Sequence, residues 1–171
     1  MDLSDPSIEV HFDSPLAFTG SVYRYTGRPG QAVRLLKYAR RTSLADFMSR
    51  SIKEAIENAG IESDLVVPVP IHWTRLMTRG FNQAELISGL LPFQPHVLRR
   101  TRATQSQAGL NSSERLKNLT GAFQVLESVK GMSVLLIDDV VTSGQTFGEC
   151  AKALREAGAT EVGGFAFCGD V

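Results

Sequence analysis

The chain has 171 residues, of which 43% are hydrophobic, and its 18 basic and 18 acidic side chains give a formal net charge of zero. This length and composition allow one domain with a buried core and exclude a disordered or fibrous polymer. The balanced charge argues against a protein that coats nucleic acid through an excess of Lys and Arg.

The N-terminal half is predicted to alternate strands and helices after a loose lead-in over residues 1–15, which are polar and interrupted by Pro. Residues 16–171 are expected to form one domain. Its first elements are a strand at 16–26, a turn at 27–30, helices at 32–38 and 44–59, and a buried strand at 64–70. Ser43 is the expected cap of the longer helix and Gly60 its end, because apolar residues recur between them at spacings of three and four.

The C-terminal half continues the alternation. Its expected elements are a helix at 82–91, a short strand from 97–98, a polar loop at 101–118, strands at 121–126 and 132–137, a helix at 145–157 and a strand at 162–168. Asn82 and Glu85 have the spacing of a capping box at the start of the first helix. Such alternation predicts an α/β fold with a parallel sheet, flanking helices and right-handed crossovers.

Charge is distributed unevenly along the chain. Residues 71–119 carry seven basic and two acidic side chains, whereas residues 127–171 carry three basic and seven acidic ones. Two interpretations stay open at this point: the segments face one cleft that holds a polyanion and its metal, or they are solvated faces of ordinary helices.

The most informative motif is VLLIDDVVTSGQT at residues 134–146. Four apolar residues predict a buried strand, Asp138 and Asp139 follow at its carboxyl end, and a polar loop opens the next helix. Ligands of open parallel sheets bind beyond the carboxyl ends of the strands, and a helix N-terminus offers unpaired N–H groups to a phosphate. The loop residues expected to surround that phosphate are Thr142, Ser143, Gly144, Gln145 and Thr146.

The two acids suit a sugar next to that phosphate. Carboxylates accept hydrogen bonds from vicinal ribose hydroxyls or help to hold hydrated Mg²⁺, so a ribose 5-phosphate would satisfy both halves of the motif. Paired acids after a strand also occur as a helix cap or a loop salt bridge, which is the alternative reading. The Walker and Gly-x-Gly-x-x-Gly patterns are absent from the sequence, which argues against nucleoside-triphosphate and dinucleotide sites.

The 134–146 motif resembles the phosphoribosyl-pyrophosphate (PRPP) motif of type I phosphoribosyltransferases. Over about residues 16–168 the chain resembles the ComF family in particular. The segments that carry this resemblance are LLKYARR at 35–41, VPVPIHWTRLMTRGFNQAE at 67–85 and RRTRATQSQAGLNSSERLKNLTGAF at 99–123. The most family-specific parts are the RGFNQ block at 79–83 and the Thr-x-x-Gln-x-x-Leu block at 104–110.

The resemblance implies a role for each matching position. Asp138 and Asp139 match the acids that hold the ribose hydroxyls, and they contact the metal indirectly, through Mg-PRPP. Residues 142–146 match the 5-phosphate loop. Ile71 and His72 match the turn that cradles pyrophosphate. Segment 101–118 matches a flexible hood loop that closes on pyrophosphate. Its candidate anion contacts are Arg102, also a candidate catalytic residue, Arg115 and Lys117, with Lys37, Arg75 and Arg79 as weaker candidates.

Two departures from the resembled families matter. ComF relatives often carry an N-terminal zinc finger, whereas no Cys precedes Cys150 here, so zinc is not expected. Mg²⁺ is the expected cofactor because the resemblance implies Mg-PRPP as ligand. Purine-salvage relatives commonly have Asp at the position of Thr142, where it handles a proton of the base, so a 6-oxopurine acceptor is not expected.

The remaining conspicuous residues are given structural roles. His11, His72 and His96 have no metal-ligand spacing, and His11 and His96 are expected at the surface. Trp73 and Phe81 are expected in the core, as are the thiols of Cys150 and Cys168. Gln107 gains functional weight from the family resemblance, and Gln105 is expected to be a polar loop residue.

Two functions from different classes stay open. One is an enzyme that transfers phosphoribosyl from PRPP to an unidentified acceptor with Mg²⁺ and releases pyrophosphate. The other is a non-catalytic module of DNA uptake that keeps the ribose-phosphate site and uses basic residues 99–117 to contact single-stranded DNA or a competence-machinery protein. Neither a signal peptide nor a membrane span is visible, so a cytoplasmic protein without membrane contact is expected, and a homodimer fits the resemblance.

Overall fold

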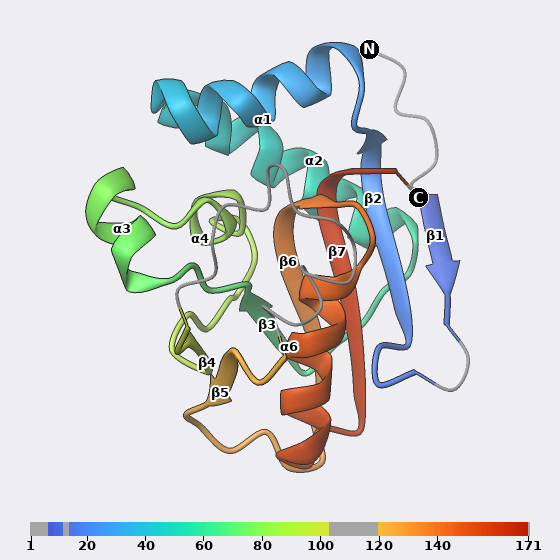
Figure 1. Cartoon of the computed structure of the whole chain (residues 1–171). Coiled ribbons are helices and arrows are strands. Elements are labelled where there is room, and N and C mark those ends of the chain that lie inside the picture. Colours follow the sequence, from blue (N-terminus) through green and yellow to red (C-terminus); the bar gives the residue numbers. More distant parts are fainter. Residues whose placement is uncertain (1–6, 12–13, 103–119, 171) are drawn as a thin grey trace.

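The protein, described by a computed structural model over residues 7–11, 14–102 and 120–170, is built around one five-stranded sheet (Figure 1). The strand order is β1-β2-β7-β6-β3, and only the β1–β2 pair is antiparallel. The strands are β1 (Ser7–Val10), β2 (Phe18–Arg24), β3 (Leu65–Pro68), β6 (Ser133–Val141) and β7 (Glu161–Gly169). This arrangement confirms the predicted α/β class with a mainly parallel sheet.

Strand β1 lies inside the segment that was predicted to be a loose lead-in, so that prediction is wrong for Ser7–Val10. The four residues pair with β2 in antiparallel register, from Ser7 opposite Ser21 to Val10 opposite Phe18. Ile8 and Val10 alternate with Ser7 and Glu9, but all four residues are exposed, and four residues are the minimum over which alternation indicates a strand. Backbone pairing with β2, the next strand in the sequence, makes these residues the edge strand of the sheet.

Helices α1 (Gly27–Ala39) and α2 (Ala45–Asn58) cover one face of the sheet. The turn expected at 27–30 is the first turn of α1, because the first N–H groups of a helix need no internal partner and Pro29 is tolerated there. Ser43 is not the cap of α2: it lies in a 3₁₀ turn, η1 (Thr42–Leu44), that leads into the helix without a side-chain cap bond.

Two short helices follow β3. Helix α3 (Trp73–Arg79) was not predicted, since seven residues are too few to show a helical period. Helix α4 (Gln83–Ile87) is shorter than the predicted 82–91. The predicted cap is confirmed, because Asn82 Oδ1 accepts from Ala84 N at 3.1 Å.

The remaining elements complete the sheet and add a small second one. The predicted strands near 97–98 and 121–126 are β4 (Leu98–Arg100) and β5 (Phe123–Val125), which pair antiparallel as a separate two-stranded sheet. Helix α6 (Gln145–Glu156) and strand β7 confirm their predictions. Strand β6 extends to Val141, so the two acids lie within the strand rather than after it.

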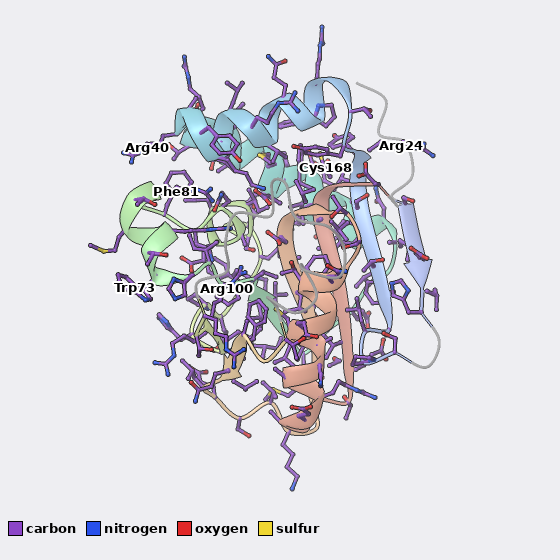
Figure 2. The ribbon with its side chains drawn as sticks, viewed as in Figure 1. Arg24, Arg40, Trp73, Phe81, Arg100 and Cys168 are labelled. Atoms are coloured by element: carbon purple, nitrogen blue, oxygen red, sulfur yellow. The ribbon has the colours of Figure 1, made fainter. Side chains whose placement is uncertain are left out.

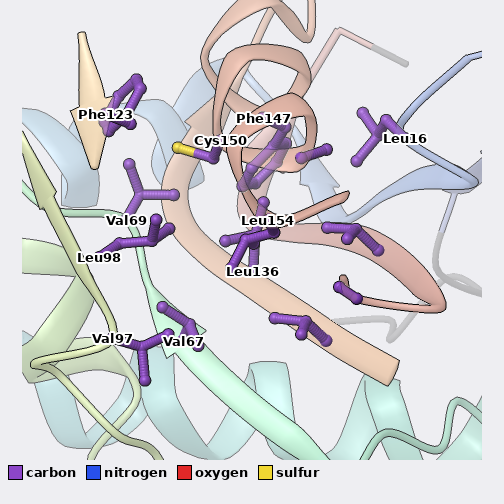
Figure 3. Packing of buried hydrophobic residues seen from close by; sticks show 14 of the residues in the cluster. Leu16, Val67, Val69, Val97, Leu98, Phe123, Leu136, Phe147, Cys150 and Leu154 are labelled. Atoms are coloured by element: carbon purple, nitrogen blue, oxygen red, sulfur yellow. The ribbon is translucent and has the colours of Figure 1, made fainter. Parts of the chain in front are cut away.

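Both faces of the parallel sheet are buried, as a parallel sheet requires. Leu136 of β6 packs with Phe147 and Leu154 of α6 on one face (Figure 3), and the neighbouring Leu135 and Ile137 face α1 and α2 on the other. Each fully buried side chain of this size contributes about 1.5–3 kcal/mol. The core therefore fixes the direction in which β6 delivers its C-terminal residues.

Helix α6 packs closely on β7 because β7 contains glycine at the contact. A Cβ at Gly164 would lie 2.6 Å from the ring of Phe147, so any larger residue would push the helix away. Phe147 lies in the first turn of α6, and the contact therefore sets the height of that turn over the end of β6.

Cys150 and Cys168 are free and buried, as predicted. Burial raises the pKa of the Cys168 thiol to about 12. Among the residues that the structure describes, no helix combines the length and the apolar character needed to cross a membrane.

Candidate functional site

A cleft of about 400 Å³ opens at the carboxyl ends of β3 and β6. Five parts of the chain line it: the end of β6 with the following loop and the first turn of α6, the exit of β3, the C-terminal part of α1, the short helices α3 and α4, and strand β4. Its polar lining side chains are Lys37, Tyr38, Arg75, Thr78, Arg79, Gln83, Arg100, Asp138, Asp139, Thr142, Ser143, Gln145 and Thr146.

The two acids of β6 form the floor of the cleft and are tied to α1. Asp139 is 4% exposed, and its Oδ1 forms an ion pair with Lys37 Nζ at 2.9 Å. Its Oδ2 is buried without a hydrogen-bond partner among the described residues. Asp138 Oδ1 accepts from Asp139 N at 2.8 Å. Lys37, a weak candidate in the sequence, is thus in direct contact with the acid pair.

Burial and mutual repulsion act on the charges of this group. Burial, followed by the negative charge of Asp139, raises the pKa of Asp138 to about 8, although Lys37 opposes the shift. Burial alone would lower the pKa of Lys37, but the charges of Asp139 and Asp138 outweigh it and raise that pKa. The floor of the cleft therefore holds an ammonium group beside two carboxyls that do not ionise independently.

The loop after β6 forms part of the cleft wall. All five predicted loop residues, 142–146, line it. Gly144 has φ +66°, a left-handed conformation that suits glycine, and it starts α6 without a side-chain cap bond. The first N–H groups of α6 have no partner within the helix, and they form the positive end of the helix dipole. The arrangement can accept a phosphate.

Basic side chains line other parts of the same cleft. Arg75 and Arg79 come from α3, and Arg100 comes from β4. Arg100 is 8% exposed, its guanidinium carbon lies 5.5 Å from the centre of the Phe123 ring, and Figure 2 shows it in the interior of the molecule. Burial lowers the pKa of Arg79 and of Arg100, with the charge of Arg75 acting in the same direction.

Sequence reasoning missed Tyr38, Thr78, Gln83 and Arg100 as site residues. One signal was available for Arg100: it lies two residues after buried Leu98 on a strand, and residues two apart point to the same face. Gln83 had another signal, because it is the last residue of the family-specific block at 79–83. Tyr38 and Thr78 had no comparable signal, because they reach the cleft from helices whose orientation the sequence does not specify.

Two of the predicted site residues lie elsewhere. Ile71 lines the cleft, but His72 does not: it caps α3, with Nδ1 3.3 Å from Thr74 N and 2.9 Å from Thr74 Oγ1. Arg102 is exposed, outside the cleft lining, and donates from Nη1 to Thr120 O at 3.3 Å. Arg115, Lys117, Gln105 and Gln107 lie outside the described residues.

Of the residues that were expected to have structural roles, some lie where they were predicted and others do not. The prediction that Trp73 lies in the core is wrong: it is 65% exposed and projects outward from α3 (Figure 2). Phe81 packs against the core as predicted. His96 is exposed as predicted, whereas His11 is half-buried, with Nε2 3.0 Å from Thr19 Oγ1.

The acids fit a magnesium ion that arrives with its ligand. Among the described residues no group of three or more His, Cys, Asp or Glu side chains could enclose a metal. Mg²⁺ typically keeps several waters and takes one or two carboxylates together with substrate phosphates. The half-buried Asp138 and the unpartnered Oδ2 of Asp139 offer carboxylate oxygens of this kind at the cleft floor.

A mainly parallel sheet with two acids and a glycine-containing phosphate loop at the end of one central strand defines a phosphoribosyltransferase-type fold. Residues 41–170 match the phosphoribosyl transferase domain, and the chain belongs to this family.

Its relatives include proteins of DNA utilization and competence. The chain is 34% identical to the DNA utilization protein YhgH of Escherichia coli K12 over 80% of its own length and 65% of that protein. It is 32% identical to YhgH of Salmonella typhimurium LT2, over 86% of the chain and 70% of that protein. Competence protein F of Haemophilus influenzae is 35% identical over 58% of the chain and 47% of that protein. The chain thus spans about half to two thirds of these relatives.

Two solved structures match most of the chain at low sequence identity. The match to UMP synthase of Leishmania donovani covers 77% of this chain and 22% of the UMP synthase chain, with 21% identity and a TM-score of 0.45. The match to the allosteric regulatory enzyme of purine biosynthesis covers 72% of this chain and 24% of that enzyme's chain, with 22% identity and a TM-score of 0.42.

Proposed function

We propose that this phosphoribosyltransferase-fold protein binds PRPP in the cleft and transfers its phosphoribosyl group to an acceptor, with Mg²⁺, releasing pyrophosphate. The observation that carries the proposal is convergence: the acid pair of β6 and the loop 142–146 line one cleft of about 400 Å³. A space of this size accommodates a sugar with its phosphates.

The residues of the cleft have separate tasks in the proposed reaction. The N–H groups at the start of α6 hold the 5-phosphate, and Asp138 and Asp139 accept hydrogen bonds from the ribose hydroxyls. Lys37 holds Asp139 in place through the 2.9 Å ion pair. Magnesium, when bound with PRPP, supplies charge neutralisation to the pyrophosphate.

The leaving group requires positive charge on the other side of the sugar. Pyrophosphate departs as an anion while positive charge develops at ribose C1, so fixed cations near the departing oxygens lower the barrier. Arg75, Arg79 and Arg100 line the cleft and are suited to this task. Ile71 stays a candidate for the pyrophosphate turn, since it lines the cleft at the exit of β3.

Arg102 keeps a candidate catalytic role through residues 101–118. Arg102 is exposed beside Thr120 and lies outside the cleft lining, so we expect it to contact the ligand only in a closed state of the enzyme during turnover.

A second candidate is a non-catalytic binding or regulatory module of DNA uptake. The observation in its favour is the relationship to YhgH and competence protein F, together with Thr142 at the position where purine-salvage relatives carry a proton-handling Asp. In this version PRPP or a related ribose phosphate is a regulatory ligand, and the basic segment 99–117 contacts single-stranded DNA or a competence-machinery protein.

Calorimetric titration with PRPP, with and without Mg²⁺, tests the ligand. The wild type is expected to bind in a metal-dependent way, and the double variant Asp138→Asn, Asp139→Asn to bind about 100-fold more weakly, because two charge-assisted hydrogen-bond acceptors are lost. A matched control, Asp46→Asn with Glu54→Gln, removes two exposed acids of α2 and should bind as the wild type does.

The outcomes separate the two candidates. Metal-dependent binding followed by pyrophosphate release with an added nucleophile supports the enzyme, whereas binding without release under an acceptor screen supports the module. No PRPP binding by folded wild-type protein would reject the enzyme and leave the module, as an inherited scaffold used for contacts. DNA contact through 99–117 predicts an affinity that falls steeply with salt.

A further inference from the structure

The family-specific block Arg79 to Gln83 connects α3 to α4, and the proposed function uses only its first residue. Arg79 lines the cleft at the end of α3, and Gln83 lines it again at the start of α4. The three residues between them reverse the chain over a short distance. The block thus brings two polar side chains to the cleft, one of which has no assigned task.

The middle of the block is built to hold that connection in one conformation. Gly80 ends α3 with φ +88°, and its N–H donates to Leu76 O at 2.7 Å. Phe81 packs against the core beneath α1 and α2. Asn82 caps α4 and donates from Nδ2 to Val69 O at 3.1 Å, which ties α4 to the exit of β3. Gln83 is therefore presented by a backbone that is fixed on both sides.

Gln83 is a buried polar side chain without a complete set of partners. It is 3% exposed, it lines the cleft, and its Oε1 is buried without a hydrogen-bond partner among the described residues. Leaving a buried carbonyl oxygen unpaired is unfavourable, and such groups are rare in folded proteins. The final torsion of glutamine is broad, so a small rotation brings this oxygen to a ligand in the cleft.

We propose that Gln83 is a ligand-binding residue of the cleft, whose carboxamide oxygen accepts a hydrogen bond from an O–H group carried by the bound ligand. This inference rests on the proposed function and deepens it. It assigns a chemical task to the last position of the block at 79–83.

The chemistry of the ligand limits where that O–H group comes from. Phosphate and pyrophosphate oxygens ionised at neutral pH accept hydrogen bonds, so they cannot pair with a carbonyl oxygen. A sugar phosphate that arrives with Mg²⁺ carries O–H donors in two places, the sugar hydroxyls and the waters on the cation. Both sources offer the same group to Gln83, and they can be separated by using each alone.

The test measures affinity by calorimetry for three probes: PRPP with Mg²⁺, ribose 5-phosphate without metal, and inorganic pyrophosphate with Mg²⁺. The variant is Gln83→Met, which keeps the length of the side chain and removes the carboxamide, that is, the acceptor oxygen together with the N–H donors. The matched control is Gln31→Met, an exposed position of α1 outside the cleft. Thermal unfolding without ligand is recorded for each protein, and Gln83→Leu replaces Gln83→Met if the latter does not fold.

The variant is expected to bind PRPP with Mg²⁺ about tenfold more weakly, as for one lost hydrogen bond, and the control to bind unchanged. Ligand-free Gln83→Met should unfold no earlier than wild type, because an unpaired buried acceptor has been removed. Weakening confined to ribose 5-phosphate identifies a sugar hydroxyl as donor. Weakening for pyrophosphate that disappears when Mg²⁺ is left out identifies a cation-bound water, whereas weakening that persists without Mg²⁺ indicates a phosphate oxygen on the carboxamide N–H and overturns the proposal.

Failure of this inference and of the proposed function give different results. If the wild type binds PRPP but Gln83→Met stays within twofold for all three probes, the role of Gln83 is rejected and the proposed function stands. If the wild type binds ribose 5-phosphate or pyrophosphate but not PRPP, the proposed function fails, and the variant still tests Gln83 on that probe. If the wild type binds none of them, both are rejected.

Discussion

An acidic residue lies at each end of the parallel β3–β6 pair, and the two environments shift the pKa of the carboxyl group in opposite directions. At the amino end Asp64 Oδ2 accepts from Ser133 N at 2.8 Å and from Ser133 Oγ at 2.7 Å, and these hydrogen bonds lower the pKa of Asp64. At the carboxyl end burial and the charge of Asp139 raise the pKa of Asp138. The first acid fastens β3 to β6, whereas the second acts against the stability of the ligand-free protein, as groups at binding sites commonly do.

The largest expected effect on stability comes from removing the ammonium group of Lys37, which balances the charge of Asp139 at the carboxyl end of the strands. Lys37→Met leaves Asp139 buried without its ion-pair partner, and breaking a buried pair on one side should lower the free energy of unfolding by about 3 kcal/mol. Chemical denaturation measures the change. The control is Lys53→Met, whose pair with Glu57 is long at 3.8 Å and exposed, so a change of no more than about 0.5 kcal/mol is expected.

A double variant sharpens this result. Adding Asp139→Asn to Lys37→Met should recover part of the loss, because the uncompensated charge is then gone. Equal stability of Lys37→Met and Lys53→Met would show that the ion pair does not stabilise the floor of the cleft.

The next effect concerns Asp138 and depends on pH. A carboxyl whose pKa is raised on folding binds its proton more tightly in the folded state, so the protein loses stability as pH rises from about 4 to about 8. Asp138→Asn removes this loss and keeps an oxygen that can accept from Asp139 N. Without added metal, the variant should exceed wild type by about 2 kcal/mol at pH 8, a value reduced for partial exposure, and by little at pH 4.

Thermal unfolding of both proteins across this pH range measures the difference. A stability gap that is constant with pH would mean that Asp138 ionises normally in the folded state, and the contrast between the two ends would disappear.

The smallest effect has the opposite sign and comes from Asp64. A carboxyl whose pKa is lowered on folding stabilises the protein above its unfolded pKa, and this stabilisation is lost as pH falls through the folded value. Asp64→Asn should therefore reduce stability slightly at neutral pH and make no difference in acid. Urea denaturation at pH 7 and pH 3 checks the trend, and a larger effect at pH 3 would contradict it.

The site was predictable where its residues are contiguous in the sequence. The acid pair and the loop 142–146 belong to one strand–loop–helix unit, so local pattern alone placed them at one end of the sheet, and the structure brings all seven residues to the cleft. The short elements were less predictable, because the four residues of β1 and the seven residues of α3 are too few to show a clear period. Without α3 in the prediction, His72 was assigned to the pyrophosphate turn rather than to a helix cap.

The sequence by itself determined the α/β class, the buried strand β6 and the place of the loop 142–146 at the end of that strand, because each follows from hydrophobic periodicity and chain neighbours. Only the tertiary structure decided the basic and polar side chains around that loop. Helix packing and strand pairing bring Lys37 to Asp139, which lies 102 positions further along the chain, and Gln83 and Arg100 reach the cleft from two further elements. Such contacts depend on how helices pack on the sheet, and packing is a property of the whole core rather than of any one segment.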